Sequence, residues 1–296
     1  MDPLSAAAIF ILGLVFGSFL NVCIQRIPRD QSIISPRSAC PACGAAISWR
    51  DNIPVLSWLL LRGRCRSCQG KISLQYPAVE LLIAALFVAS VVAFGTGAMA
   101  LKAAVFCFLT VGLIFMDAET GLLPAEFTYS GIALGLLFAW LVPFDVSVRQ
   151  IPSAIFGLAV IGSDASSSLI AAAAAALLGA AFFYLVWAAY YLVKKADGSG
   201  FGDIAMAAML GAFLGPKGLI VAVVLAYLLG TAYAAVLFVS LLTKRRTGDG
   251  EKTPLHDSLH ALGLRAAPFG VFLGTAGIVS LFWGNSIWRW YLGFVL

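Results

Sequence analysis

Two aspartates at the ends of apolar runs are the leading candidates for chemistry. Asp117 follows one apolar run, and Asp203 follows the string Gly200-Phe201-Gly202 and precedes another. Charged side chains are costly beside hydrocarbon, so carboxylates that adjoin such runs are candidates for function. Two carboxylates at one site can share a proton, so that one activates water as a general base while the other, protonated, polarises a carbonyl group. Such a pair could hydrolyse a carbonyl substrate.

Structural roles for the same residues stay open from position alone. Asp203 could cap a helix behind a glycine turn, and Asp117 could be an ordinary loop charge. Gly200 and Gly202 could shape the site, because glycine lets the backbone approach an extended substrate or adopt a positive φ. Glu80 lies about one turn into a further apolar run, where it could pair with a basic residue or line the site.

Four of the six cysteines form two closely spaced pairs. Cys40 and Cys43 make the first pair, Cys65 and Cys68 make the second, and 21 residues separate the pairs. Two such pairs can supply the four thiolates of a tetrahedral Zn²⁺ site. Because the protein supplies all four ligands, no position is left open for catalysis, and the predicted zinc is structural. Disulfides or a redox pair are the alternatives.

The composition is that of a membrane protein. Hydrophobic residues make up 61% of the 296 residues, charged residues make up 11%, and the mean hydropathy is +0.96. A soluble domain has about a quarter of its residues charged, so much of this apolar surface must face lipid. Hydropathy predicts an all-α polytopic protein with about eight transmembrane helices. The predicted spans are 4–24, 77–95, 99–116, 127–143, 168–193, 204–215, 218–242 and 268–284.

The basic residues predict the orientation of these spans. With the N-terminus outside, residues 25–76 hold eight Lys and Arg, and residues 194–203 and 243–267 hold seven more, fifteen of the nineteen in the chain. This is the positive-inside pattern. It predicts that both termini are periplasmic and that Asp117 and Asp203 lie at the cytosolic edge. The net charge of +5 therefore reflects topology and requires no nucleic-acid partner.

The longest polar stretch between spans predicts a small domain. Residues 25–76 are too many for a simple connection and are rich in Pro, Gly, Ser, Arg and Cys. The chain is therefore divided into a first transmembrane helix (1–24), a cytosolic zinc-binding domain with four cysteine ligands (25–76) and a transmembrane core (77–296). The outer loop 144–167 is predicted to be a solvated linker.

These features, taken in order, resemble the bacterial type IV prepilin peptidases, which are GxGD-type membrane aspartic peptidases. The likeness runs from about residue 10 to 275. The motifs that carry it are Gly17-Ser18-Phe19-Leu20-Asn21-Val22, Arg26-Ile27-Pro28, the two cysteine pairs, Tyr76-Pro77-Ala78-Val79-Glu80-Leu81, Asp117 with Leu122-Leu123-Pro124, Gly200-Phe201-Gly202-Asp203 and Pro268-Phe269-Gly270.

The resemblance implies an eight-span protein of the bacterial inner membrane. Its expected activity is removal of the short basic leader from type IV prepilins or type II secretion pseudopilins, by a cut at the cytosolic membrane face between a Gly and an aromatic residue. Members with the cysteine domain also N-methylate the new N-terminus with S-adenosylmethionine. Asp117 and Asp203 match the two catalytic aspartates of the family, and the four cysteines match its metal-binding tetrad. The expected partners are prepilin substrates and membrane lipid.

Some residues depart from the family pattern. Many members carry an Asp after Leu-Leu-Pro, where this chain has Ala125 and then Glu126, which strengthens Asp117 as the working residue of its segment. Many also carry a Lys where this chain has Ala205. A protein with degenerate peptidase motifs, acting as a zinc-stapled membrane scaffold or assembly factor that binds prepilins without cutting them, is the alternative function.

Overall fold

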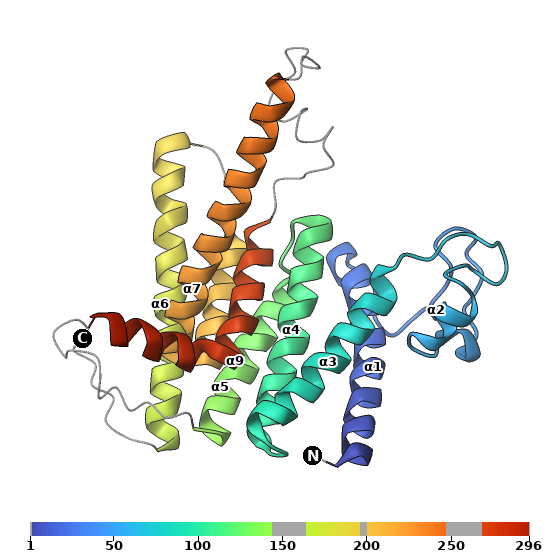
Figure 1. The fold of residues 1–296 in the computed structure, drawn as a ribbon, viewed down its shortest axis with the longest axis horizontal. Coiled ribbons are helices and arrows are strands. Elements are labelled where there is room, and N and C mark those ends of the chain that lie inside the picture. The colour runs from blue at the N-terminus through green and yellow to red at the C-terminus, as the bar shows by residue number, and fades with distance from the viewer. Residues whose placement is uncertain (1, 144–163, 196–199, 247–267, 296) are drawn as a thin grey trace.

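The structure, a computed structural model, is helical throughout most of the residues that it describes (2–143, 164–195, 200–246 and 268–295; Figure 1). Most of the predicted outer loop 144–167 lies outside the described residues. The helices, with η marking short 3-10 helices, are α1 (Pro3–Arg26), η1 (Ile27–Arg29), η2 (Trp49–Asn52), α2 (Leu56–Leu60), α3 (Gln75–Phe94), α4 (Ala98–Thr120), α5 (Ala125–Leu141), α6 (Ala165–Lys194), α7 (Phe201–Arg246) and α9 (Phe269–Val295).

The chain is a multi-pass membrane protein. Six of its helices are long and apolar enough to cross a bilayer, and α5 is a shorter apolar helix. The helix α7 is interrupted at Gly215, where φ is 68° and ψ is −176°, and Pro216 follows. With α7 counted as a first arm (201–214) and a second arm (216–246), the apolar helices correspond to the eight predicted spans, and the predicted fold class is confirmed.

The first arm of α7 runs parallel to α9. A Cβ atom placed on Gly274 would lie 2.9 Å from Met206 Cε, and one turn later Gly277 packs against Leu210. Residue numbers therefore rise together along these two helices. An arm of fourteen residues is about 21 Å long at 1.5 Å per residue, which is less than the roughly 30 Å of bilayer hydrocarbon.

The second arm runs in the opposite direction along the same helix. Ser280 Oγ donates a hydrogen bond to the Gly218 carbonyl oxygen at 2.7 Å, whereas Tyr227 contacts Phe269 with ring centroids 5.3 Å apart. Here residue numbers rise on α7 as they fall on α9. The chain therefore reverses at Gly215, and α7 is a helical hairpin.

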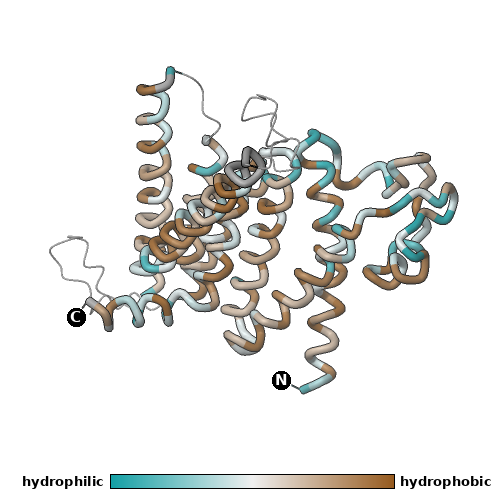
Figure 2. Tube along the Cα trace, turned by 45° about the horizontal axis from the view of Figure 1, so that its top comes forward, coloured by the Kyte–Doolittle hydropathy of each residue, from teal (hydrophilic) through white to brown (hydrophobic). Residues whose placement is uncertain are grey.

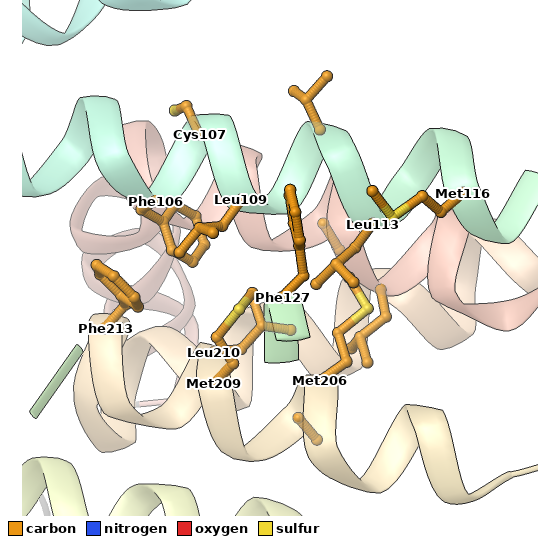
Figure 3. Packing of buried hydrophobic residues seen from close by; sticks show 14 of the residues in the cluster. Phe106, Cys107, Leu109, Leu113, Met116, Phe127, Met206, Met209, Leu210 and Phe213 are labelled. Carbon is orange, nitrogen blue, oxygen red and sulfur yellow. The ribbon is translucent and has the colours of Figure 1, made fainter. Parts of the chain in front are cut away.

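The core of the bundle lies between α4, α5 and the first arm of α7. Figure 3 shows Met206, Met209 and Leu210 of α7 facing Leu109 and Leu113 of α4, with side chains that are almost fully buried. On the other side of the molecule, Gly13 and Gly17 on α1 face the backbone of α3. Small residues at this spacing allow two membrane helices to approach closely.

Residues 27–74, which form the four-cysteine region, lie beside the bundle (Figure 1). Figure 2 shows hydrophilic segments beside the hydrophobic α2 in this region, whereas the long helices are predominantly hydrophobic. The helix α1 continues to Arg26 and α3 begins at Gln75, so both overlap the ends of the predicted domain 25–76. That division of the chain stays a prediction.

Two helices are longer than hydropathy predicts. The helix α4 continues past the predicted limit of 116 to Thr120, and α9 continues past 284 to Val295. Charged and polar residues lower the local hydropathy, but they do not interrupt the backbone hydrogen bonds of a helix. Asp117 is consequently a residue of α4, and the interpretation of it as a loop charge is wrong.

Candidate active site and metal centre

The register between α4 and α7 brings Asp117 and Asp203 to the same level of the bundle. Phe106 of α4 and Phe213 of α7 contact each other with ring centroids 5.2 Å apart. Asp117 lies eleven residues after Phe106, and Asp203 lies ten residues before Phe213. Gly274 of α9 packs against both Ile114 of α4 and Met206 of α7, so residue numbers rise along α4 as they fall along this arm of α7. The two aspartates therefore lie at the same end of these helices, where their carboxylates interact electrostatically.

Asp117 is held by the beginning of α9. Its side chain is only 4% exposed, and its Oδ2 atom accepts a hydrogen bond from the backbone N–H of Val271 at 3.1 Å. Gly270 packs so closely against Oδ2 that a Cβ atom there would collide with it. The unpaired N–H groups and the positive end of the dipole at a helix N-terminus favour an anionic side chain. The Pro268-Phe269-Gly270 motif therefore positions Asp117.

Asp203 is the third residue of α7 and is half-buried. The helix begins at Phe201, so Asp203 is not its N-cap residue. Gly200 lies directly before the first helical residue, and its carbonyl oxygen accepts a hydrogen bond from the N–H of Ile204 at 3.3 Å. Besides Asp117, Asp203 interacts electrostatically with the phenol of Tyr227 on the second arm.

Leu123 packs between the segments that carry the two aspartates. A Cβ atom on Gly202 would lie 2.8 Å from Leu123 Cβ, and one on Gly270 would lie 3.2 Å from Leu123 Cδ1. Gly202 therefore makes room for Leu123, and its approach to substrate stays a prediction. The Leu-Leu-Pro and Pro-Phe-Gly motifs were recognised in the sequence, but their contacts with the aspartate segments were not predicted. Tyr227 was not predicted at all, because a tyrosine in an apolar span gives no distinguishing signal.

Glu80 does not join the aspartate pair. Its Oε2 atom accepts a hydrogen bond from the backbone N–H of Val55 in the four-cysteine region at 2.7 Å. Glu80 lines a cavity of about 1270 Å³ between the four-cysteine region and the helices α1 and α3. Asn21, Trp58 and Tyr76 line the same cavity.

The four predicted metal ligands lie together in the four-cysteine region. All four Sγ atoms are within 4.8 Å of one another, and those of Cys40 and Cys68 are 3.9 Å apart. A tetrahedron with Zn–S bonds of about 2.3 Å has sulfur atoms about 3.8 Å apart, so the cluster is close to the size that a metal ion requires. No disulfide links these cysteines.

The two cysteine pairs share one backbone conformation, which presents their sulfur atoms to a common point. The Cys40 N–H donates to the Ala45 carbonyl, and the Cys65 N–H donates equivalently to the Gly70 carbonyl. The backbone N–H groups of Cys68 and Ser67 lower the pKa of the Cys65 thiol to about 6. A thiol that ionises this easily is suited to metal binding, because the thiolate is the ligand.

Comparison with known proteins identifies the family to which the chain is similar. Residues 11–94 match the bacterial peptidase A24 N-terminal domain, and residues 103–235 match the type IV leader peptidase family. The chain is 35% identical to the prepilin leader peptidase/N-methyltransferase of Aeromonas hydrophila, over 96% of this chain and 92% of the relative. It is 33% identical to that of Pseudomonas aeruginosa (96% and 92%) and 38% identical to that of Myxococcus xanthus (83% and 66%).

No solved structure matches the chain at a comparable level. The matched regions nevertheless include every candidate site residue predicted from the sequence: the four cysteines and Glu80 lie in the first region, and both aspartates with Gly200 and Gly202 lie in the second. The chain therefore belongs to the type IV leader peptidase family.

Proposed function

We propose that this chain removes the leader from type IV prepilins or related pseudopilins with Asp117 and Asp203 as its catalytic pair, and then methylates the new N-terminus. The observation that carries the proposal is the convergence of these two carboxylates, 86 positions apart in sequence, at one level of the bundle. Membership of the family and near full-length similarity to prepilin leader peptidase/N-methyltransferases support both activities.

The surroundings of the pair suggest a division of labour. Asp117 accepts a hydrogen bond from the N-terminus of α9, which stabilises it as the carboxylate. Asp117 therefore takes a proton from water as the water oxygen attacks the scissile carbonyl carbon, and Asp203 gives its proton to the carbonyl oxygen. When the C–N bond breaks, Asp117 returns its proton to the leaving amine and a hydroxyl of the intermediate reprotonates Asp203. The leaving amine is the N-terminus of the mature pilin.

We further propose that the site faces the cytosol at the inner membrane and that both termini are periplasmic. The distribution of Lys and Arg supports this orientation. So does the hydrogen bond that Gln75, at the start of α3, donates to Glu119, in the last turn of α4. By this contact, the four-cysteine region and Asp117 lie at the same end of the bundle.

The cluster of four cysteines would hold a structural Zn²⁺ ion. The mutual spacing of its sulfur atoms fits such an ion. When bound, the ion would fix the two cysteine pairs relative to each other and so support the wall of the adjoining cavity, since Cys40 and Cys65 both line it.

The cavity beside Glu80 is the proposed site of methyl transfer. Its volume of about 1270 Å³ exceeds that of ordinary ligand pockets, about 300 to 1,000 Å³, so it can accommodate a cofactor and a peptide end. The Glu80 carboxylate suits the sulfonium of S-adenosylmethionine, and the basic residues that also line the cavity, among them Arg26 and Arg29, suit the carboxylate of that cofactor. That cofactor, when bound, supplies the methyl group.

The proposed function is tested by incubating the purified protein with a candidate prepilin and S-adenosylmethionine and measuring the product masses. We expect a product that has lost its leader and gained one methyl group. A prepilin that binds but keeps its full mass would instead identify a scaffold without catalytic activity.

A further inference from the structure

The hairpin of α7 places Tyr227 opposite Asp203. Asp203 lies twelve residues before Gly215, and Tyr227 lies twelve residues after it. In a continuous helix these residues would be about 36 Å apart, at 1.5 Å per residue. The reversal at Gly215 returns Tyr227 to the level of Asp203, and the two side chains interact electrostatically.

Three phenylalanine rings fix the position of the Tyr227 ring. Phe183 of α6 stacks on it with centroids 6.5 Å apart and an interplanar angle of 12°. Phe182 meets it edge-on at 6.3 Å, and Phe269 of α9 lies 5.3 Å away. Contacts from two other helices thus restrain the ring, so orienting its hydroxyl costs little further conformational entropy.

The same segment that holds Asp117 also packs against Tyr227. Phe269 contacts the Tyr227 ring, whereas Gly270 and Val271, the next two residues, contact Asp117. Tyr227 therefore lies at the junction between the two aspartates. Its hydroxyl is the one polar side-chain group in a cluster that otherwise consists of the rings of Phe182, Phe183 and Phe269.

We propose that Tyr227 is a positioning residue for the peptidase reaction, and that its hydroxyl donates a hydrogen bond to Asp203 and holds this carboxyl group towards Asp117 and the scissile carbonyl. The proposal rests on the assignment of Asp117 and Asp203 as the catalytic pair. Hydrogen bonds at catalytic sites are often long in the free enzyme and tighten when substrate binds. The role of Tyr227 is therefore expected in the catalytic step and not in substrate binding.

The substitution Tyr227→Phe separates this role from packing, because it keeps the ring and its three aromatic contacts and removes only the hydroxyl. Asp203 becomes a carboxylate as it gives its proton to the scissile carbonyl, and loss of a hydrogen bond to such a charged group lowers the rate by about tenfold to hundredfold. We expect kcat for prepilin cleavage to fall by about that factor while KM stays unchanged. Tyr184→Phe is the matched control, since it removes a hydroxyl from a half-exposed tyrosine next to Phe183 and should leave kcat unchanged.

The assay includes Asp203→Asn and Tyr227→Leu beside these variants. If Asp203→Asn is inactive and Tyr227→Phe retains the full kcat, the positioning role is wrong while the catalytic pair stands. If Asp203→Asn is active, the pair itself is wrong. Equal losses in Tyr227→Phe and Tyr227→Leu support the hydroxyl, whereas a loss confined to Tyr227→Leu would assign Tyr227 to packing alone.

Discussion

The backbone N–H of Val271 donates a hydrogen bond to Asp117 Oδ2 at 3.1 Å, across 154 positions of sequence. The bond joins the last turn of α4 to the N-terminus of α9, and Gly270 packs against the same oxygen. A carboxylate fixed in this way has little freedom to rotate. The start of α9 therefore supports the proposed active site, although it carries no candidate catalytic residue.

Gly270→Ala should impair cleavage, because the new Cβ atom would collide with Asp117 Oδ2 and displace it. A misplacement of about 1 Å can cost about a hundredfold in rate, so we expect kcat to fall by at least about tenfold. Gly293→Ala in the same helix is the control, since its Cβ atom would meet nothing within 4 Å. Steady-state kinetics on a prepilin would measure the difference, and equal rates for the two variants would contradict it.

Gly17→Ala should separate α1 from α3. Its Cβ atom would lie 2.6 Å from the Cα atom of Glu80, a backbone atom that cannot move without its helix. Overpacking of this kind costs about 1 to 3 kcal/mol. Thermal unfolding in detergent should show a lower Tm than for Gly293→Ala, a substitution that is also inside a helix but whose Cβ atom would meet nothing within 4 Å. An unchanged Tm would mean that these helices are not packed as described.

Glu80→Gln should reduce methylation and spare cleavage. The amide keeps the shape of the side chain and can still accept the hydrogen bond from Val55, but it loses the charge proposed to attract the cofactor. Product masses should then show leaderless pilin without the added methyl group. Methylation at the normal rate would remove Glu80 from the proposed site, and loss of cleavage would assign it to the peptidase reaction.

Cys40→Ser and Cys65→Ser should each lower the metal content of the purified protein, which we expect to be about one Zn²⁺ per chain. Loss of the ion should destabilise the four-cysteine region and reduce methyl transfer more than cleavage. Cys23→Ala, which alters a buried cysteine outside the cluster, should keep the metal. Elemental analysis beside both activity assays would test this, and an equal loss of the two activities would place the four-cysteine region in the peptidase site.

The sequence predicted the cysteine cluster well because the information is local. Each pair is formed by residues that are close in sequence, so only one contact between the two pairs is needed to complete the cluster. The spacing of the cysteines within each pair is already typical of a metal site. The shared level of Asp117 and Asp203 was also predictable, since the distribution of basic residues sets the direction of each span. The reversal within α7 was visible in the two predicted spans 204–215 and 218–242.

The contacts around these residues were not predictable, because they depend on helix packing. Whether Glu80 would meet the aspartates or the four-cysteine region depends on the close approach of α1 to α3 at Gly17. Tyr227 is one aromatic residue among many in apolar spans, and only the hairpin register distinguishes it. The burial of Asp117 required α4 to continue past the point where its hydropathy falls.

The central claim is tested most directly by the cleavage rate of Asp117→Asn and Asp203→Asn on a prepilin substrate, measured on protein shown to be folded by its Tm. Each substitution removes a group that transfers protons, and each is expected to lower kcat/KM by about a thousandfold. Glu126→Gln, which alters an exposed carboxylate nine positions after Asp117 in the sequence, should cleave at the rate of the unaltered protein. Undiminished cleavage by either aspartate variant would contradict the assignment of the pair.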